Sequence, residues 1–215
     1  MRIFIYFLLI TFFYTTYVQS NEKVIVFDFT TNDLSKFKSH SIKKTTNYVI
    51  EIDQNGGSYL KAVAEGQASG LGREIKVDLN KTPFLNITWK VEQGIYGIKE
   101  NSKKGHDFAA RVTVIKETGS LPWQKKAMNY VFSSNEKTNS HWTGPYRKQI
   151  IDYVASSLVD SKENSWVTVK LNVKEHFKKF LDLDLGEIDG VAIMTDTDNT
   201  KQKAVSYYKN IYFSN

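Results

Sequence analysis

One stretch of this chain decides its fold class: Leu85-Asn86-Ile87-Thr88-Trp89-Lys90-Val91 alternates apolar and polar side chains without a break. Such alternation is typical of a β-strand with one buried face and one wet face. Ten further runs rich in apolar, β-branched or aromatic residues occur along the chain, separated by turn residues. They cover residues 24–29, 46–52, 59–65, 71–79, 108–116, 127–133, 149–156, 166–172, 190–195 and 205–213. About eleven strands and almost no helix predict an all-β protein, an antiparallel β-sandwich or jelly roll.

A single short helix is predicted near residues 173–181. Asn172 can cap its first turn, and Val173 and Phe177 lie on one face while lysines and a glutamate occupy another. We expect this helix to cover an open end of the sandwich. His176 lies at the margin of the polar face and is expected on the surface.

The first twenty residues have the pattern of a secretory signal peptide. Arg2 supplies a positive charge, residues 3–13 are almost wholly apolar, and a polar segment follows Ser20. The apolar run is shorter than the roughly 20 residues that a transmembrane helix needs. We expect residues 1–20 to be a cleaved signal peptide and residues 21–215 a single β-sandwich domain. The mature protein would be exported, periplasmic or extracellular, with no stable membrane span; an uncleaved anchor is the alternative.

Composition and charge exclude several kinds of site and partner. The 215 residues contain no cysteine, so disulfides, thiolate nucleophiles and cysteine-based zinc sites are excluded. Lysines and arginines number 29 against 23 aspartates and glutamates, and the lysine pairs are spread along the chain. A dispersed excess of this size is not the basic patch of a nucleic-acid-binding protein, so no nucleic-acid partner is predicted.

Motifs of known enzymes do not occur in the chain. There is no HExxH, GxSxG, Walker or dinucleotide-binding pattern. The four histidines, His40, His106, His141 and His176, are scattered without metal-ligand spacing. No catalytic residue is therefore assigned, and the sequence favours a binding protein over an enzyme without deciding between them.

The densest polar run is Thr195-Asp196-Thr197-Asp198-Asn199-Thr200, directly after an apolar strand. Its oxygen atoms could bind Ca²⁺ or accept hydrogen bonds from sugar hydroxyls. Asp196, Asp198 and Asn199 are therefore candidate ligands of a structural calcium ion, the one cofactor that the sequence suggests. The alternative is a tight turn held by hydrogen bonds from its side chains to the backbone.

Asp107 and Arg111 are predicted to share one face of a strand whose other face is apolar. A buried arginine needs an anionic partner, which Asp107 or a carboxylate on a neighbouring strand could supply. The alternative is that Arg111 contacts an anionic or sugar ligand. Both residues are candidate ligand-binding residues, together with Asn129 in the predicted strand 127–133.

Two aromatic residues, Trp142 and Tyr146, lie in a long polar stretch over residues 133–149. Exposed aromatic rings stack on the apolar faces of sugars and also anchor protein contacts. Both are candidate ligand-binding residues, and the alternative is that they fold the loop down onto its own sandwich. Residues 95–107 form a second long stretch, and long loops of this kind gather at the rims of a sandwich, where binding surfaces are usually built.

Several segments resemble known proteins. Asp28-Phe29, followed by Leu34 and Phe37, is similar to the opening strand of galactose-binding-like jelly rolls, which include many carbohydrate-binding modules. Nearly the whole chain after residue 20 resembles an exported bacterial family classified as a domain of unknown function, number three thousand and forty-seven. The most distinctive segment is Met194-Thr195-Asp196-Thr197-Asp198-Asn199-Thr200, which is followed by Ala204 and Tyr207-Tyr208. The others are residues 68–71, 83–91, 107–112 and 127–131. The resemblance implies an exported, single-domain β-sandwich and transfers no catalytic residue.

These patterns predict a non-catalytic binding domain whose ligand is a carbohydrate or another glycan component of the cell envelope. Part of that prediction rests on analogy of fold. One alternative is a glycan-active enzyme, a hydrolase or lyase that would use Asp107, Arg111 and Asp196. The other is a domain that interacts with proteins of the envelope.

Overall fold

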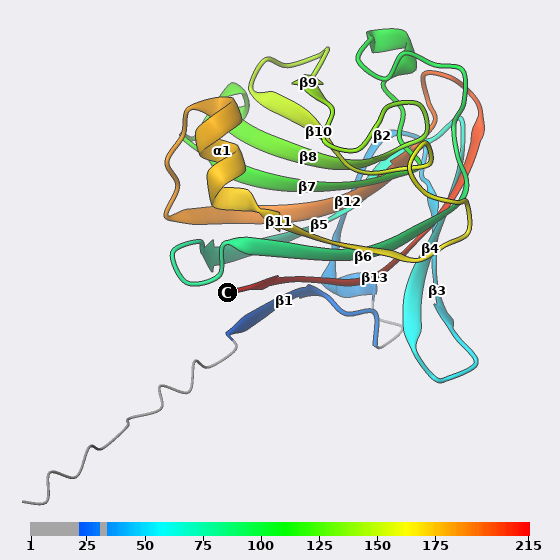
Figure 1. Cartoon of the computed structure of the whole chain (residues 1–215), viewed down its shortest axis with the longest axis horizontal. Coiled ribbons are helices and arrows are strands. Elements are labelled where there is room, and N and C mark those ends of the chain that lie inside the picture. The colour runs from blue at the N-terminus through cyan, green and yellow to red at the C-terminus, as the bar shows by residue number, and fades with distance from the viewer. Residues whose placement is uncertain (1–21, 31–33) are drawn as a thin grey trace, which may run out of the picture.

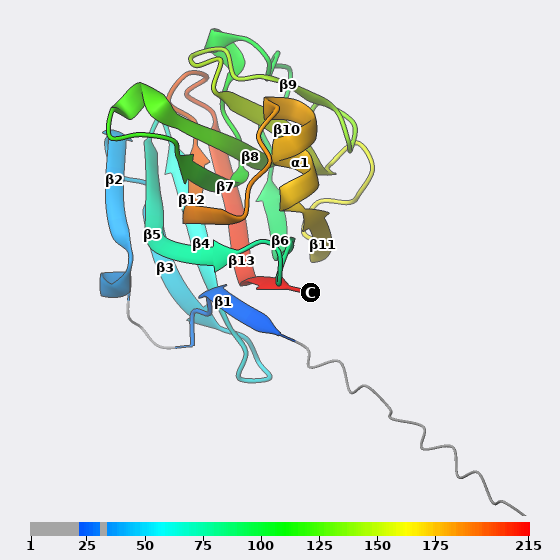
Figure 2. The same cartoon turned by 90° about the vertical axis from the view of Figure 1, so that its left-hand side faces the viewer.

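A computed structural model describes residues 22–30 and 34–215, which form two β-sheets packed face to face (Figures 1 and 2). The predicted signal peptide lies outside these residues. Among the described residues there are thirteen strands and one α-helix. None of the helices in this part of the chain is long and apolar enough to cross a membrane.

The first sheet has six strands in the order β11-β6-β13-β4-β3, with β1 also paired to β13. Its strands are β1 (Lys23–Phe27), β3 (Asn47–Ile52), β4 (Ser58–Glu65), β6 (Phe84–Gln93), β11 (Val167–Asn172) and β13 (Lys203–Ser214). The second sheet has seven strands in the order β2-β5-β12-β7-β8-β10-β9. Its strands are β2 (Lys38–Lys43), β5 (Ala68–Asp78), β7 (Ala110–Glu117), β8 (Lys125–Ser133), β9 (His141–Thr143), β10 (Ile150–Ser157) and β12 (Glu187–Asp196).

The all-β sandwich expected from the sequence is confirmed, with two differences in detail. Strands β2 and β9 were not expected, because β2 is exposed along its whole length and β9 has only three residues, so neither shows alternation. In addition, β8 and β10 pair in parallel, whereas the other pairs of described strands are antiparallel. The long connection that contains β9 is what allows the chain to cross over and re-enter the sheet in the same direction.

The core lies between the two sheets and follows the alternation of the sequence. Leu85, Ile87 and Trp89 of β6 are fully buried. The indole of Trp89 donates a hydrogen bond of 2.9 Å to the hydroxyl of Ser156 in the opposite sheet, so its polar atom is satisfied. Asn86, expected on the wet face, is also buried, and its side-chain amide donates a hydrogen bond to the hydroxyl of Ser214 at 3.0 Å.

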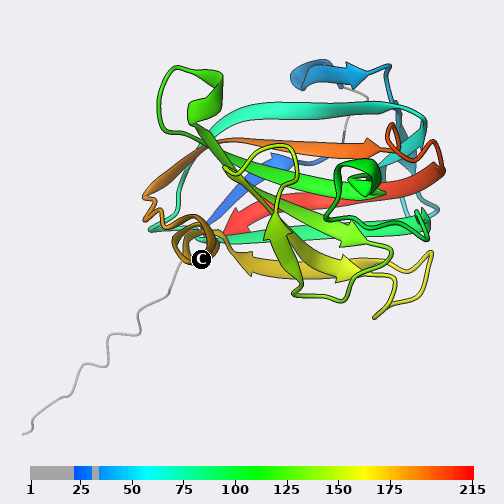
Figure 3. The same ribbon diagram turned by 90° about the horizontal axis from the view of Figure 1, so that it is seen from above.

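The helix α1 (Val173–Leu181) begins and ends where the sequence predicts. The side chain of Asn172 accepts a hydrogen bond from the main-chain nitrogen of Glu175 at 3.2 Å, which caps the first turn. Val173 and Phe177 are buried, and the helix packs against both sheets at one end of the sandwich (Figures 1 and 3). His176 is half-buried rather than on the surface, because its ring packs 4.6 Å from that of Tyr153.

Candidate functional site

The outer face of the seven-stranded sheet carries a groove made of two adjoining cavities, of about 550 and 450 Å³. Both are lined by Ile42, Thr113 and Met194, so they form one continuous depression, which we call the sheet groove. The larger cavity lies over β5, β12 and β7 and is called the trough. The smaller one, called the polar end, extends over β8 and under the loops that precede β7 and β10.

Small residues form the floor of the trough. Gly70 and Gly72 of β5 lie beside Ala192 and Met194 of β12 in the register of the sheet. A Cβ atom at Gly70 would come within 2.8 Å of the carbonyl oxygen of Ile193, so a side chain is excluded there. A Cβ atom at Gly72 would make only ordinary contacts, and a larger side chain there would project into the trough.

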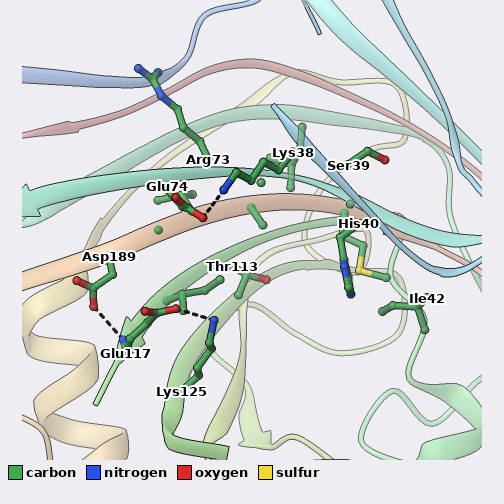
Figure 4. A pocket seen from close by; sticks show the side chains of 18 residues that line it. Lys38, Ser39, His40, Ile42, Arg73, Glu74, Thr113, Glu117, Lys125 and Asp189 are labelled. Carbon is green, nitrogen blue, oxygen red and sulfur yellow. Dashed lines mark hydrogen bonds and ion pairs between the residues drawn. The ribbon is translucent and has the colours of Figure 1, made fainter. Parts of the chain in front are cut away.

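One wall of the trough is formed by β2. The other is formed by the ends of β7 and β8 next to the turn that joins them (Figure 4). Their charged side chains are paired with one another. Lys38 Nζ lies 2.6 Å from Glu74 Oε1, and Lys125 Nζ lies 2.5 Å from Glu117 Oε1. The guanidinium of Arg73 turns away to donate to main-chain carbonyls of β1 at 2.6 and 3.2 Å. Because these charged side chains lie in the walls and are engaged there, the exposed floor of the trough is mostly apolar.

At the polar end, Arg111 of β7 and Asp196 at the end of β12 form a buried ion pair. Arg111 Nη2 donates to both carboxylate oxygens of Asp196 at 2.9 Å. Of the two partners that the sequence allowed, the structure places the carboxylate of a neighbouring strand against Arg111. The guanidinium also lies 4.8 Å from the ring of Phe108. Burial raises the pKa of Asp196 to about 6; Arg111 opposes this rise and the nearby charge of Asp107 adds to it.

A hydrogen-bonded ladder crosses the sheet beside this pair. Thr113 of β7 donates to Asn129 of β8 at 2.7 Å, and Asn129 donates to Asp152 of β10 at 2.7 Å. These three residues are directly opposite one another in the register of the strands. Asp152 Oδ2 in turn lies 2.9 Å from His106 Nε2. Both hydrogen-bonding groups of the Asn129 amide are thus engaged, which fixes its orientation.

Asp152 is fully buried, yet its environment favours the ionised form. Burial alone would raise the pKa of Asp152, but the hydrogen bond and charge of His106, with help from Arg111 and Asn129, hold it below its usual range. An ionised Asp152 accepts a hydrogen bond from the N–H group at His106 Nε2. In neutral imidazole this leaves His106 Nδ1 as an acceptor, and His106 is one of the residues lining the polar end.

The run of polar residues after β12 is held in place by Asp107. Its carboxylate accepts hydrogen bonds from the main-chain nitrogens of Asn199 and Thr200 at 3.1 and 2.7 Å, and from Asn199 Nδ2 at 2.9 Å. This joins the loop before β7 to the β12–β13 connection, and Figure 1 shows both at one end of the sandwich. The turn is thus tied by a carboxylate from a distant segment, rather than by its own side chains alone.

Three carboxylates gather at this turn and could hold a cation. One oxygen each from Asp107, Asp196 and Asp198 lies within 4.8 Å of the others. Hard oxygen donors suit Ca²⁺, but Asp107 is already bound by N–H donors and Asp196 by Arg111. Calcium at this cluster therefore stays a prediction, and the guanidinium beside it favours weak affinity.

The structure brings most of the predicted site residues to the sheet groove. Arg111, Asn129 and Tyr146 line its polar end, as do the three candidate calcium ligands Asp196, Asp198 and Asn199. Tyr146 is 54% exposed, and its hydroxyl lies 2.8 Å from the carbonyl oxygen of Lys103 and 3.0 Å from Asn199 Oδ1. Asp107 supports the turn from behind.

Trp142 has a different position from Tyr146. Its ring stacks on Phe108 at 6.5 Å and packs on a small apolar cluster with Val131 and Val154, and it lines neither cavity of the groove. The position agrees with the alternative that this aromatic residue folds its loop onto the sandwich. The cluster supports the loop that carries Tyr146.

Two residues of the site were missed by reasoning from the sequence. Asp152 is a single carboxylate in the apolar run Ile150-Ile151-Asp152-Tyr153-Val154, and a charge in a buried strand is a signal that could have been read. Its partner His106 is 46 residues away in the chain. Nothing local in the sequence connects the two.

The family described as protein of unknown function DUF3047 matches residues 33–212 of this chain. No curated protein matches the chain in sequence.

The fold is similar to that of several solved carbohydrate-related structures. The family 30 carbohydrate-binding module of the cellulosomal cellulase Cel9D-Cel44B of Clostridium thermocellum superposes with a TM-score of 0.52 at 10% identity, covering 89% of this chain and 96% of that module. A β-1,2-glucanase from Parabacteroides distasonis gives 0.47 at 10% identity, over 90% of this chain and 25% of the glucanase. The module TmCBM61, solved with β-1,4-galactotriose, gives 0.41 at 10% identity, over 87% of this chain and 94% of the module. At these identities the likeness concerns the fold alone.

Proposed function

This chain belongs to the DUF3047 family of proteins of unknown function, and we propose that it binds a carbohydrate in the sheet groove without cleaving it. Export of the protein, to the periplasm or the extracellular medium, is part of this proposal and rests on its first twenty residues. An envelope glycan is the ligand that such a location would offer.

The observation that carries the proposal is that one groove combines a mainly apolar surface with a few side chains that can form hydrogen bonds. A sugar ring has apolar faces and a polar rim, so it needs both kinds of surface. The floor of Gly72, Ala192 and Met194 can lie against the faces of the rings. His106 and Arg111 can exchange hydrogen bonds with their hydroxyls. A largely apolar cavity with a few convergent polar groups is the usual form of a small-molecule site.

The polar end is rigid before any ligand arrives, which favours binding. Thr113, Asn129, Asp152 and His106 hold one another in a continuous ladder, and Arg111 is held by Asp196. Side chains fixed in this way lose little further freedom when they contact a ligand. The fold also supports carbohydrate binding, since its β-sandwich is similar to that of a carbohydrate-binding module over 96% of that module's length.

Filling the trough tests this proposal. Ala192 lies in the floor, so Ala192→Phe places an aromatic ring where the sugar is expected. Val49→Phe is the matched control, because Val49 is 43% exposed on the six-stranded sheet. In affinity gel electrophoresis against immobilised glycans, we expect Ala192→Phe to weaken binding by about tenfold or more. The Val49→Phe variant should bind as the unaltered protein does. Equal binding by all three proteins would contradict the proposal.

A glycan hydrolase is the second candidate, favoured by the carboxylates of Asp196 and Asp198, which approach within 4.8 Å. Retaining glycosidases place their two carboxyl groups about 5–5.5 Å apart. Against this, both oxygens of Asp196 accept hydrogen bonds from Arg111, which leaves this carboxyl poorly placed to donate a proton to a leaving group. The appearance of new reducing ends during incubation with a bound glycan would favour the enzyme over the binding domain.

A further inference from the structure

The charge of the sheet groove differs from that of the whole chain. The chain carries a formal charge of +6. Five cationic side chains line the two cavities: Lys38, Arg73, Arg111, Lys125 and Arg147. Five carboxylates line them as well: Glu74, Glu117, Asp189, Asp196 and Asp198. The groove is therefore formally neutral within a basic protein, with its two histidines counted as uncharged.

Three of the five positive charges in the groove are also neutralised by direct ion pairs. Lys38 and Lys125 are paired with carboxylates in the trough, and Arg111 is paired with Asp196 at the polar end. His106 faces the ionised carboxylate of Asp152. An acidic sugar that entered would have to give up the hydration of its carboxylate, and it would find these cations already compensated.

Hydrogen-bonding capacity for neutral groups remains at the polar end. Among the described residues, the Arg111 side chain donates from Nη2 alone. Its Nε is buried without a partner, so Nη1 is the group left to donate to a ligand. His106 Nδ1 likewise has no hydrogen-bond partner in this part of the chain. The Arg111 N–H groups are donors, whereas His106 Nδ1 is an acceptor in the neutral ring and a donor in the protonated ring. A hydroxyl can serve both roles, whereas a carboxylate can only accept.

From this pairing of charges we propose that the sheet groove takes uncharged glycan chains in preference to acidic ones. The inference rests on the proposed function and names its ligand class. The trough and the polar end together form one depression over β5, β12, β7 and β8, so the ligand is a chain of several sugar units rather than a single sugar. Its ring faces lie on the trough, and its hydroxyls contact His106 and Arg111.

The excess positive charge of the protein lies outside the groove. Acidic polymers that bind to this charge can be distinguished from glycans that bind in the groove. Acidic polymers will associate with dispersed surface lysines, but such contacts are screened at about 0.15 M salt, where the Debye length is about 8 Å. They will also be unaffected by a side chain that fills the trough. Binding in the groove should persist at this salt concentration, and it should be weakened by a side chain that fills the trough.

The test is affinity electrophoresis at about 0.15 M salt in gels that contain a neutral or an acidic polysaccharide. The neutral probes are xyloglucan, hydroxyethylcellulose and β-1,4-galactan, and the acidic probes are polygalacturonate and alginate. We expect a neutral probe to retard the unaltered protein and the Val49→Phe variant but not Ala192→Phe. Acidic probes should retard all three proteins weakly and equally.

A second experiment removes one carboxylate from the trough. Glu74→Gln leaves Lys38 without its partner in the trough. We expect the ratio of its affinity for polygalacturonate to its affinity for a neutral probe to rise about two- to fivefold, and an unchanged ratio would contradict the inference about charge.

Two results would overturn the inference in different ways. If Ala192→Phe abolishes retardation by an acidic probe that binds as tightly as any neutral one, the groove binds glycans but the inference about charge is wrong. If Ala192→Phe changes no retardation at all, the groove is not the binding site, and the proposed function fails together with the inference.

Discussion

Arg111 Nη2 donates to both carboxylate oxygens of Asp196 at 2.9 Å, across the neighbouring strands β7 and β12. Both residues are more than nine-tenths buried. Both residues of the pair also line the polar end of the groove. The pair therefore contributes to the stability of the fold and also holds the site in its shape. Breaking it should therefore be costly in a way that can be measured.

Asp196→Asn should destabilise the protein by about 3–5 kcal/mol, because it removes the carboxylate that is hydrogen-bonded to the buried guanidinium of Arg111. Urea unfolding monitored by tryptophan fluorescence would measure the change. The double variant Arg111→Met, Asp196→Leu removes both charges and should recover a large part of the loss. A loss below about 0.5 kcal/mol for Asp196→Asn would show that the pair contributes little.

Trp142 and Tyr146 should behave differently, although the sequence made both of them candidate ligand-binding residues. Trp142 packs on Phe108 in the apolar cluster, so Trp142→Ala should lower the free energy of unfolding by about 2–4 kcal/mol. Tyr146 is largely exposed at the polar end, so Tyr146→Ala should weaken glycan binding with a smaller change in stability. Thermal unfolding and affinity electrophoresis of both variants would decide, and a stable Trp142→Ala protein that no longer binds glycan would reverse the assignment.

His176 should make the protein less stable in mild acid. Burial, with the charges of Lys179 and His141, lowers the pKa of His176 from 6.5 to about 4. Between these values the unfolded chain binds a proton that the folded chain does not, so stability falls as the pH is lowered from about 6.5 towards 4. Allowing for its partial exposure, the effect is about 1–2 kcal/mol.

The variant His176→Gln isolates this contribution from other groups that titrate nearby. Asp196, whose pKa is raised, acts in the opposite direction over part of the same range. Because it is present in both proteins, it cancels when their unfolding curves are compared at several pH values. The variant should lose less stability than the unaltered protein between pH 6.5 and 4; parallel curves would exclude the role given to His176.

Calcium should raise the unfolding temperature only at high concentration. Three carboxylates converge at the turn after β12, but Arg111 lies against one of them, which predicts a dissociation constant of about 10⁻⁴–10⁻³ M. Binding to the folded state alone raises the midpoint by mass action. Asp198→Asn should abolish the shift. If neither Ca²⁺ nor EDTA changes the midpoint, the cluster is held by hydrogen bonds alone.

The fold was predictable because most of its strands can be recognised from the pattern of their own residues. Alternation in residues 85–91 and the cap at Asn172 were sufficient for β6 and α1. β2 gave no such signal, since it is held by main-chain pairing with β5 while its side chains face water. The parallel pairing of β8 and β10 also depends on the path of the chain between them, which local patterns do not specify.

The site was predictable only in part, because it is made by strands that are distant in sequence. Arg111, Asn129 and Tyr146 stood out by their residue types, and the fold brings them together. The pairing of Asp152 with His106 depends on the order of strands in the sheet and on where a loop crosses it. The groove itself exists because small residues of β5 and β12 happen to be neighbours, a relation that neither strand reveals alone.

The central claim is that a glycan binds on the outer face of the seven-stranded sheet. Its most direct test is the mapping of amide chemical shifts by NMR while xyloglucan oligosaccharides, or oligosaccharides of whichever glycan retards the protein, are added. We predict that the perturbed amides lie in β5, β12, β7 and β8, around Gly72, Thr113, Asn129 and Ala192. Perturbations confined to the six-stranded sheet, around Val49 and Trp166, would contradict the account.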